Sequence, residues 1–242
     1  MPGIFGEWQV YRSHYAASYT SDTKLHNTHP DDTPAPHPDL DLVYRDGMLL
    51  VLNKPAGLLA VPGRGADKLD SLATRVQAWF PDALVVHRLD MATSGLMLFA
   101  RGEQMQRRFC AMFRERGIEK RYTAVVAGKL EQAGEIALPL SRDWPNRPKQ
   151  KVNMAEGKPS LTRYRLLSHD AGTRTSRVEL EPVTGRTHQL RVHLATIGHP
   201  ILGDALYGDA TSARRLLLHA SELGFVHPQR GEWLVCKSAP AF

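Results

Sequence analysis

The stretch LVVHRLDMATSGLMLFA, residues 84–100, decides the fold, because it places a polar cluster between two apolar runs. The runs at 84–86 and 96–100 consist of residues such as Leu, Val and Phe and predict two strands. The segment HRLDMATSG between them follows neither a strand nor a helix period and closes on a turn-permissive glycine, Gly95. Polar groups are therefore delivered together between two strands.

Further strands and helices are predicted on both sides of this stretch. LVYRDGMLLVLNKPAG at 42–57 predicts a hairpin that turns at Asp46-Gly47. Helical periods predict helices over 71–80, 103–117 and 187–198, the first ended by Pro81 and the last by Gly198. Apolar runs predict strands over 121–128, 161–167 and 176–183, and a hairpin over 224–237. The order of these elements predicts an α+β fold.

Composition limits the classes of function. The chain has 242 residues, 42% of them hydrophobic, so it can bury a substantial core. Its 31 Lys and Arg against 25 acidic residues give a net charge of +6, which favours a polyanionic partner, although simple solubility accounts for the same balance. The two cysteines form no disulfide framework or CxxC metal motif. No apolar stretch has the length of a signal peptide or membrane span, so we expect a soluble, cytoplasmic protein.

The chain divides into a polar extension and one folded domain. Residues 1–40 are polar and rich in proline, and we expect a flexible N-terminal extension there. The structural signal begins near Leu42, so a single catalytic domain is predicted over 41–242.

The loop motif is long enough to indicate a family. HRLDMATSG resembles the HRLDxxTSG signature of the RluA family of pseudouridine synthases. The similarity continues in family order through NKPAGLLAVPG (53–63), EKRYTAVVAG (119–128), GRTHQLRVHLATIGHPILGD (185–204) and RLLLHA (215–220). DWPNRPKQKV at 143–152, followed by GKP, resembles the RluA subgroup that acts on both transfer and ribosomal RNA.

The resemblance implies a fold and a chemistry. The fold would be the pseudouridine synthase core, a mixed, mainly antiparallel sheet flanked by helices. Asp90 corresponds to the catalytic aspartate of the family, whereas a lone loop Asp is ordinarily structural. The reaction breaks the bond from ribose C1′ to uracil N1 and rejoins the sugar to C5 without net redox change, so no cofactor or metal is expected. Adduct formation on the sugar, adduct formation on the base and a glycal route all remain open for Asp90.

Two further catalytic residues are carried over from the family. Arg186 in GRTHQLR is the candidate ion-pair partner that would keep Asp90 ionised, although an exposed arginine at a helix start is the ordinary alternative. Tyr122 in KRYTAVV would pack against the target base and help remove the proton from C5, although a strand tyrosine more often serves packing alone.

Other residues are candidates for contact with the RNA. A uridine in an RNA stem-loop must be flipped outward, and Arg88 matches the family arginine that fills the vacated space. Leu218 would line the base pocket, unless it serves only the core, and His87 belongs to the same RNA- and base-binding set. Arg147 and Lys149 lie in a second basic cluster, beside Trp144, and are candidate phosphate contacts.

Other classes of protein fit the sequence less well. His188, His193 and His199 form the densest histidine group, but their spacing departs from the HExxH zinc motif. Gly-rich phosphate-binding motifs are absent, which removes kinases and dehydrogenases. A non-catalytic RNA-binding module on the same scaffold and a hydrolase using Asp90 remain alternatives.

The expected substrates are structured RNAs. We expect a uridine in the anticodon loop region of transfer RNA and one in a hairpin of 23S ribosomal RNA, with an enzyme acting on transfer RNA alone as the second hypothesis. Many relatives carry an S4 RNA-binding domain, for which the residues before Leu42 are too few and too polar. Target choice would then rest on the catalytic domain, with no membrane and no obligate protein partner.

Overall fold

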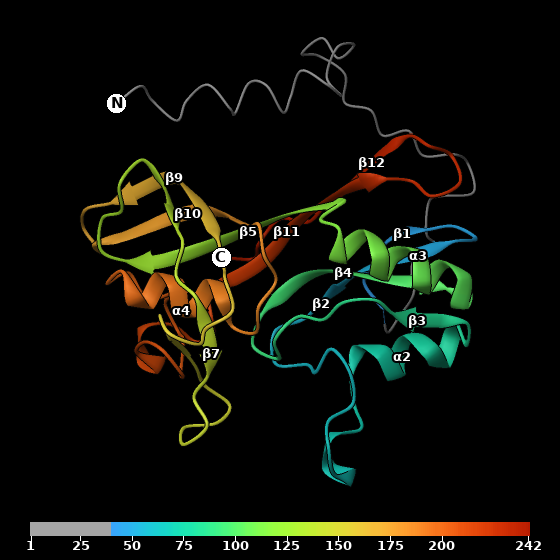
Figure 1. Cartoon of the computed structure of the whole chain (residues 1–242), viewed down its shortest axis with the longest axis horizontal. Helices are drawn as coiled ribbons and strands as arrows, with labels where there is room; N and C mark the ends of the chain where they lie inside the picture. Colours follow the sequence, from blue (N-terminus) through green and yellow to red (C-terminus); the bar gives the residue numbers. More distant parts are fainter. Residues whose placement is uncertain (1–39) are drawn as a thin grey trace. The chain divides into compact units, whose positions relative to one another are not determined.

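The computed structural model describes residues 40–242, and the predicted extension at 1–40 lies almost entirely outside them. Strands and helices follow one another without a repeating unit (Figure 1). The strands are β1 (Leu42–Arg45), β2 (Leu49–Lys54), β3 (Ala83–Val85), β4 (Ser94–Arg101), β5 (Ile118–Ala127), β6 (Ala133–Ile136), β7 (Leu140–Arg142), β8 (Gln150–Val152), β9 (Thr162–Asp170), β10 (Thr175–Pro182), β11 (Leu218–Val226) and β12 (Trp233–Lys237). The helices are η2 (Ala66–Lys68), α2 (Leu72–Trp79), α3 (Gly102–Arg114), α4 (Gln189–Thr196) and η3 (Ala210–Ser212).

Most strands join one large sheet. Its order is β1-β2-β4-β11-β5-β10-β9-β6, with β3 paired to β4 and β12 paired to β11, and β7 and β8 form a separate hairpin. Neighbours in the large sheet are antiparallel except β4 and β11, which are parallel where Ser94 meets His219. The predicted α+β class with a mixed, mainly antiparallel sheet is confirmed.

The first half of the sheet is covered on both faces. Successive residues of a strand point to opposite faces, so Val51 and Leu98 pack with Phe109 of α3, while Leu52 and Phe99 pack on the other face with α2. The sequence predicts the start of α2 and the buried face of α3. Ser71 caps α2 by accepting from the backbone N–H of Thr74, and α3 buries the apolar stripe that its helical period indicates.

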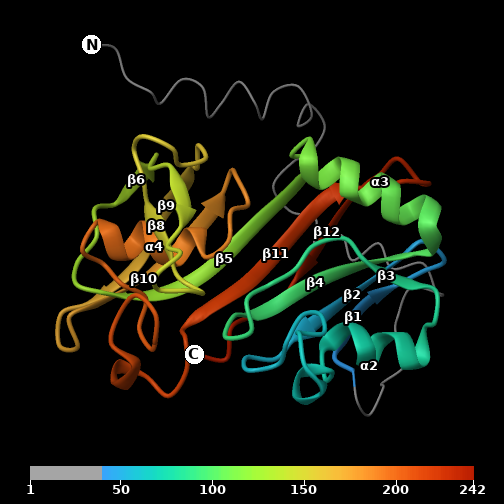
Figure 2. The same cartoon turned by 60° about the horizontal axis from the view of Figure 1, so that its bottom comes forward.

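The second half of the sheet packs against α4. Leu190 and Leu194 of α4 contact Val126 of β5 and Leu180 of β10, in a core separate from those of the first half. The strands β5 and β11 are long enough to enter both halves, and Figure 2 shows them side by side along the middle of the molecule. The active-site loop at 86–93 and the segment before α4 both lie at this junction.

Candidate active site

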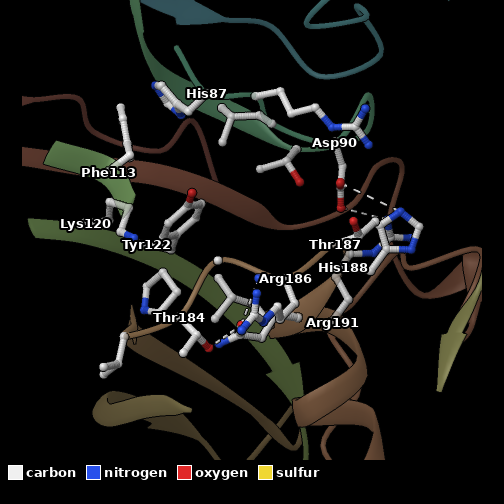
Figure 3. A pocket seen from close by; sticks show the side chains of 18 of the residues that line it. His87, Asp90, Phe113, Lys120, Tyr122, Thr184, Arg186, Thr187, His188 and Arg191 are labelled. Carbon is white, nitrogen blue, oxygen red and sulfur yellow. Dashed lines mark hydrogen bonds and ion pairs between the residues drawn. The ribbon is translucent and has the colours of Figure 1, made fainter. Parts of the chain in front are cut away.

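An open cleft of about 530 Å³ lies over the central strands. It is lined by the loop before β4, the end of α3, the start of β5, the segment leading into α4 and one residue of β11. In the view of Figure 3, Asp90, His188 and Arg191 stand at one end, whereas His87, Phe113 and Lys120 stand at the other. The cleft therefore combines acidic, basic and aromatic groups from distant parts of the chain.

A buried lysine forms a hydrogen bond to the loop that carries Asp90. Lys54, at the end of β2, is 1% exposed and donates to the carbonyl oxygens of Pro55, Leu58 and Met91 at 2.8, 2.8 and 3.0 Å. Burial lowers the pKa of its ammonium to about 8, although the negative charge of Asp90 acts in the opposite direction. The Lys-Pro segment after the first hairpin thus supports the residue that follows Asp90.

The end of the loop is joined to β11. The Ser94 hydroxyl lies 2.9 Å from Nδ1 of His219 and accepts from Arg215 at 3.0 Å. Gly95 has a φ of 112°, and a Cβ there would stand 2.3 Å from the carbonyl oxygen of Ala220. A side chain at this position would separate the two strands, so the Thr-Ser-Gly part of the motif sets where Asp90 stands.

Asp90 pairs with an arginine that we did not predict. Its Oδ2 accepts from an Nη of Arg191 at 3.2 Å, and its side chain remains 21% exposed to the cleft. The prediction that Arg186 supplies this charge is wrong, because Arg186 lies on the exposed loop before α4, where its Nε points to the carbonyl oxygen of Pro159 at 3.4 Å. Arg186 lines the cleft, but within residues 40–242 the arginine that pairs with Asp90 is Arg191.

Arg191 is itself held in place by a second carboxylate. Its Nε and an Nη donate to the two oxygens of Asp204 at 2.8 and 2.7 Å, and both side chains are almost completely buried. Burial disfavours the charged form of both Arg191 and Asp204. The mutual hydrogen bonds and attraction outweigh it, so the pKa of Asp204 is lowered and that of Arg191 is raised. The arginine is therefore a permanent cation facing Asp90.

A sequence signal for Arg191 existed. It lies between Leu190 and Val192 inside the helical run QLRVHLAT, and a charged residue in such an apolar run must find a buried partner. Asp204, in the following loop, supplies that partner. Arg186 precedes the helix and lacks this feature.

Tyr122 and Leu218 lie on neighbouring strands beside the cleft. Both line the cleft, Tyr122 from β5 and Leu218 from β11, and Leu218 is 3% exposed. Burial, with the nearby charge of Asp90, raises the pKa of the Tyr122 phenol. The hydroxyl therefore keeps its proton at neutral pH.

The candidate RNA contacts occupy different places. Arg88 is exposed at the cleft. His87 also lines it, but its Nε2 accepts from the backbone N–H of Leu98 at 2.8 Å and its ring lies 4.5 Å from that of Phe113. Arg147 and Lys149 lie outside the cleft lining, in the loop of the β7–β8 hairpin, where Arg147 stacks 5.1 Å above the ring of the exposed Trp144.

The three histidines that suggested a metal have separate partners. His193 bonds to Thr162 and to the carbonyl of Leu138, His199 to the carbonyl of Ala127, and His188 faces Asp90. Within residues 40–242 the side chains form no group of three or more that could hold a metal ion. No helix in this part of the chain is both long and apolar enough to cross a membrane.

The chain is similar to proteins with one type of activity. Residues 48–196 match the model of the family described as RNA pseudouridylate synthase. The chain is 50% identical over 205 residues to the dual-specificity RNA pseudouridine synthase RluA of Vibrio cholerae, covering 83% of this chain and 82% of that one. It is 48% identical over 212 residues to the protein of that name from Escherichia coli strain K12, covering 86% and 96%.

Solved structures agree with the sequence relatives. Human RNA Pseudouridylate Synthase Domain Containing 1 superposes with a TM-score of 0.72 at 30% identity, covering 87% of each chain. Human RNA Pseudouridylate Synthase Domain Containing 4 superposes with a TM-score of 0.66 at 26% identity, covering 82% of this chain and 88% of that one.

Proposed function

Because this chain belongs to the RNA pseudouridylate synthase family, within its RluA group, we propose that it isomerises chosen uridines of transfer RNA and of 23S ribosomal RNA through Asp90. The observation that carries the proposal is the pair formed by Asp90 and Arg191 in the cleft. Such chemistry uses a carboxylate, and the buried guanidinium of Arg191 places a cation 3.2 Å from its Oδ2.

The reaction requires few groups. The bond between C1′ and N1 breaks, a bond between C1′ and C5 forms, and the proton lost from C5 is matched by one gained at N1. Asp90 acts as an anion beside the sugar and base, where it stabilises or captures the fragment that the broken glycosidic bond leaves. Since no electrons are exchanged with another reactant, the proposal includes no cofactor.

The target base would stand between Tyr122 and Leu218. An aromatic ring on one strand and an apolar side chain on the next supply flat and apolar surfaces for a uracil ring. The raised pKa of Tyr122 favours a neutral phenol that packs against the base. If the phenol oxygen takes the proton from C5, the phenol must give up its own proton in the same step, because a doubly protonated phenol oxygen is too acidic to form.

The RNA would approach along a basic rim. Arg88, Arg114, Arg116 and Arg186 are exposed residues that line the cleft. Guanidinium groups bind phosphate and stack on bases, and Arg88, two residues from Asp90, would occupy the gap that a flipped uridine leaves. The hairpin loop with Arg147, Lys149 and Trp144 offers a second basic and aromatic surface.

Dual specificity is supported by two relatives that are named dual-specificity enzymes and are identical to this chain at about half of the aligned residues. The DWPNRPKQKV segment, by which the sequence resembles that subgroup, includes the hairpin loop just described and all of β8. Action on these two RNAs would place the protein in the cytoplasm.

The test uses unmodified transcripts of transfer RNA and of 23S ribosomal RNA fragments, incubated with purified protein without added cofactor or metal. Pseudouridine is mapped by chemical modification, and Asp90→Asn is the matched control because it keeps the shape of the side chain without its charge. We expect one modified site in each RNA with the natural protein and none with the variant.

The other outcomes are informative. Modification of the transfer RNA alone would replace dual specificity by the narrower alternative. Tight binding to both RNAs without product would identify a binding module that keeps the synthase scaffold.

A further inference from the structure

His188 faces Asp90 across the cleft and has no role in the chemistry described so far. Its Nε2 lies 3.7 Å from Oδ1 of Asp90, whereas Arg191 holds Oδ2 at 3.2 Å (Figure 3). The histidine side chain is only 10% exposed. The two oxygens of the carboxylate thus have different neighbours.

The backbone holds His188 in an unusual conformation. Its φ of 54° lies in the left-handed region, which residues with a Cβ seldom adopt and which persists only where the surroundings enforce it. The buried side chain of Gln189 supplies that enforcement. It accepts from the backbone N–H of Arg186 at 3.0 Å and from the Thr184 hydroxyl at 2.7 Å, and donates to the Leu161 carbonyl at 2.9 Å.

The other ring nitrogen contacts a tyrosine. Nδ1 of His188 lies 2.7 Å from the hydroxyl of Tyr207, in the loop after α4. The same hydroxyl accepts from the backbone N–H of Gln150, the first residue of β8, at 2.7 Å. Tyr207 also places its ring 5.2 Å from the guanidinium carbon of Arg191, so it contacts both residues that face Asp90.

These contacts decide the tautomer of the imidazole. The Tyr207 hydroxyl has one hydrogen, and its oxygen already accepts from Gln150. In the part of the chain that the structure describes, Nδ1 of His188 is the acceptor in reach of that hydrogen. Since Nδ1 then accepts, a neutral ring must carry its proton on Nε2, the nitrogen that faces Asp90.

The charges around the ring favour its neutral form. Burial lowers the pKa of His188, and the cations Arg191 and Arg88 act in the same direction. Asp90 and Asp204 act in the opposite direction without reversing the shift. At neutral pH His188 is therefore an uncharged donor, so it can direct a carboxylate without neutralising it.

We infer that His188 is a positioning residue whose Nε2–H, set by Tyr207, holds Oδ1 of Asp90 and stops the carboxylate from rotating about its Cβ–Cγ bond. The inference rests on the proposed role of Asp90. The present separation of 3.7 Å is too long for a hydrogen bond, so His188 and Asp90 would have to move closer when RNA binds. Catalytic hydrogen bonds are often long without substrate and shorten in the complex.

Three variants test the inference by single-turnover modification of one transcript at saturating enzyme. His188→Ala removes the donor and should lower the rate about 30-fold while the dissociation constant of the RNA changes less than about twofold. His188→Gln keeps an N–H near the position of Nε2 and should recover most of the rate. Tyr207→Phe keeps the ring beside Arg191, removes the hydroxyl that contacts both His188 and the Gln150 N–H, and should lower the rate about fivefold.

A double substitution separates positioning from a general structural role. If Tyr207 acts through His188, adding Tyr207→Phe to His188→Ala should cause no further loss of rate, because the hydroxyl no longer has a ring to orient. His169→Ala, which removes an imidazole from β9 outside the cleft lining, is the matched control and should leave the rate unchanged.

Each result bears on one hypothesis. A normal rate for His188→Ala, a defect confined to RNA binding, or full additivity with Tyr207→Phe would overturn the inference. Should His188→Ala fail to fold, His188→Gln and Tyr207→Phe still decide it, because a rate equal to that of the natural protein in Tyr207→Phe contradicts the tautomer argument. No product from the natural protein would contradict the proposed function instead.

Discussion

Gly95 and Ala220 lie so close together that a Cβ on Gly95 would stand 2.3 Å from the Ala220 carbonyl oxygen. This contact lies in the parallel pairing of β4 with β11, five residues after Asp90. The position of the Asp90 carboxylate therefore depends on a site where only hydrogen fits.

Gly95→Ala tests this dependence. The substitution combines a left-handed backbone with a clash against main-chain atoms, so we expect it to lower the free energy of unfolding by about 3 kcal/mol and to abolish modification. Gly231→Ala is the matched control, since Gly231 also has a positive φ (71°) but open space around its Cα, and should cost about 1 kcal/mol. Equal losses in chemical denaturation would show that the close approach to β11 has no effect of its own.

Arg191 and Arg186 should respond differently to the same substitution. Arg191→Lys keeps a charge but loses the paired hydrogen bonds to Asp204, so the single-turnover rate should fall about 100-fold. Arg186→Lys, on the exposed loop, should change the rate less than about twofold and alter only RNA affinity. A larger effect of Arg186→Lys than of Arg191→Lys would support Arg186 as the ion-pair partner of Asp90 instead.

Acid should destabilise the fold in part through His87. Burial lowers the pKa of His87 to about 3 from an ordinary value of 6.5, so between these pH values the unfolded chain binds a proton that the folded protein does not. Stability is then lost as pH falls from 6.5 towards 3, by about 2 kcal/mol, less than the full shift because the ring is partly exposed.

His87→Gln measures that contribution. A glutamine oxygen can accept from the Leu98 N–H without titrating, so urea unfolding of this variant should lose less stability between pH 6.5 and pH 4 than that of the natural protein. Identical pH dependence of the two would contradict the assignment to His87.

The β7–β8 loop should contribute charge to RNA binding. Arg147→Gln and Lys149→Gln should each weaken binding and reduce the slope of log affinity against log salt by about 0.7 to 0.9. Lys237→Gln changes the net charge equally, but Lys237 lies on β12 in an ion pair with Glu222, so its slope should stay unchanged. Equal slopes for all three variants would indicate that only total charge matters.

Much of the fold could be predicted because its signals are local. Asp46-Gly47 turns the first hairpin, Ser71 caps α2, and the apolar stripe of α3 follows its helical period. The short strands β6, β7 and β8 were not predicted. Each has three or four residues, too few to show a period in the sequence, and β6 pairs with β9 rather than with a neighbour in the chain, whereas β7 and β8 pair with each other across a polar loop.

The sequence predicts a site residue well where its motif contains only one residue of that type. Asp90 stands in the cleft as its motif indicates, but its cation was assigned to Arg186, because a motif contains several arginines and does not show which one turns inward. Asp204 decides the matter through its buried pair with Arg191, a contact between α4 and the loop that follows it which the motif does not show. His188 was considered solely as a metal ligand, since its role depends on Tyr207 and on Gln150.

The long strands β5 and β11 have a mechanical consequence. Asp90 comes from the first half of the sheet and Arg191 from helix α4 of the second, yet the two halves share these continuous hydrogen-bonded strands. Domain closure usually turns on a few linker residues, and two paired strands cannot pivot in that way without breaking their ladder. We therefore expect little hinge motion between the two halves, so most of the shape change that would bring a uridine to Asp90 should fall on the RNA.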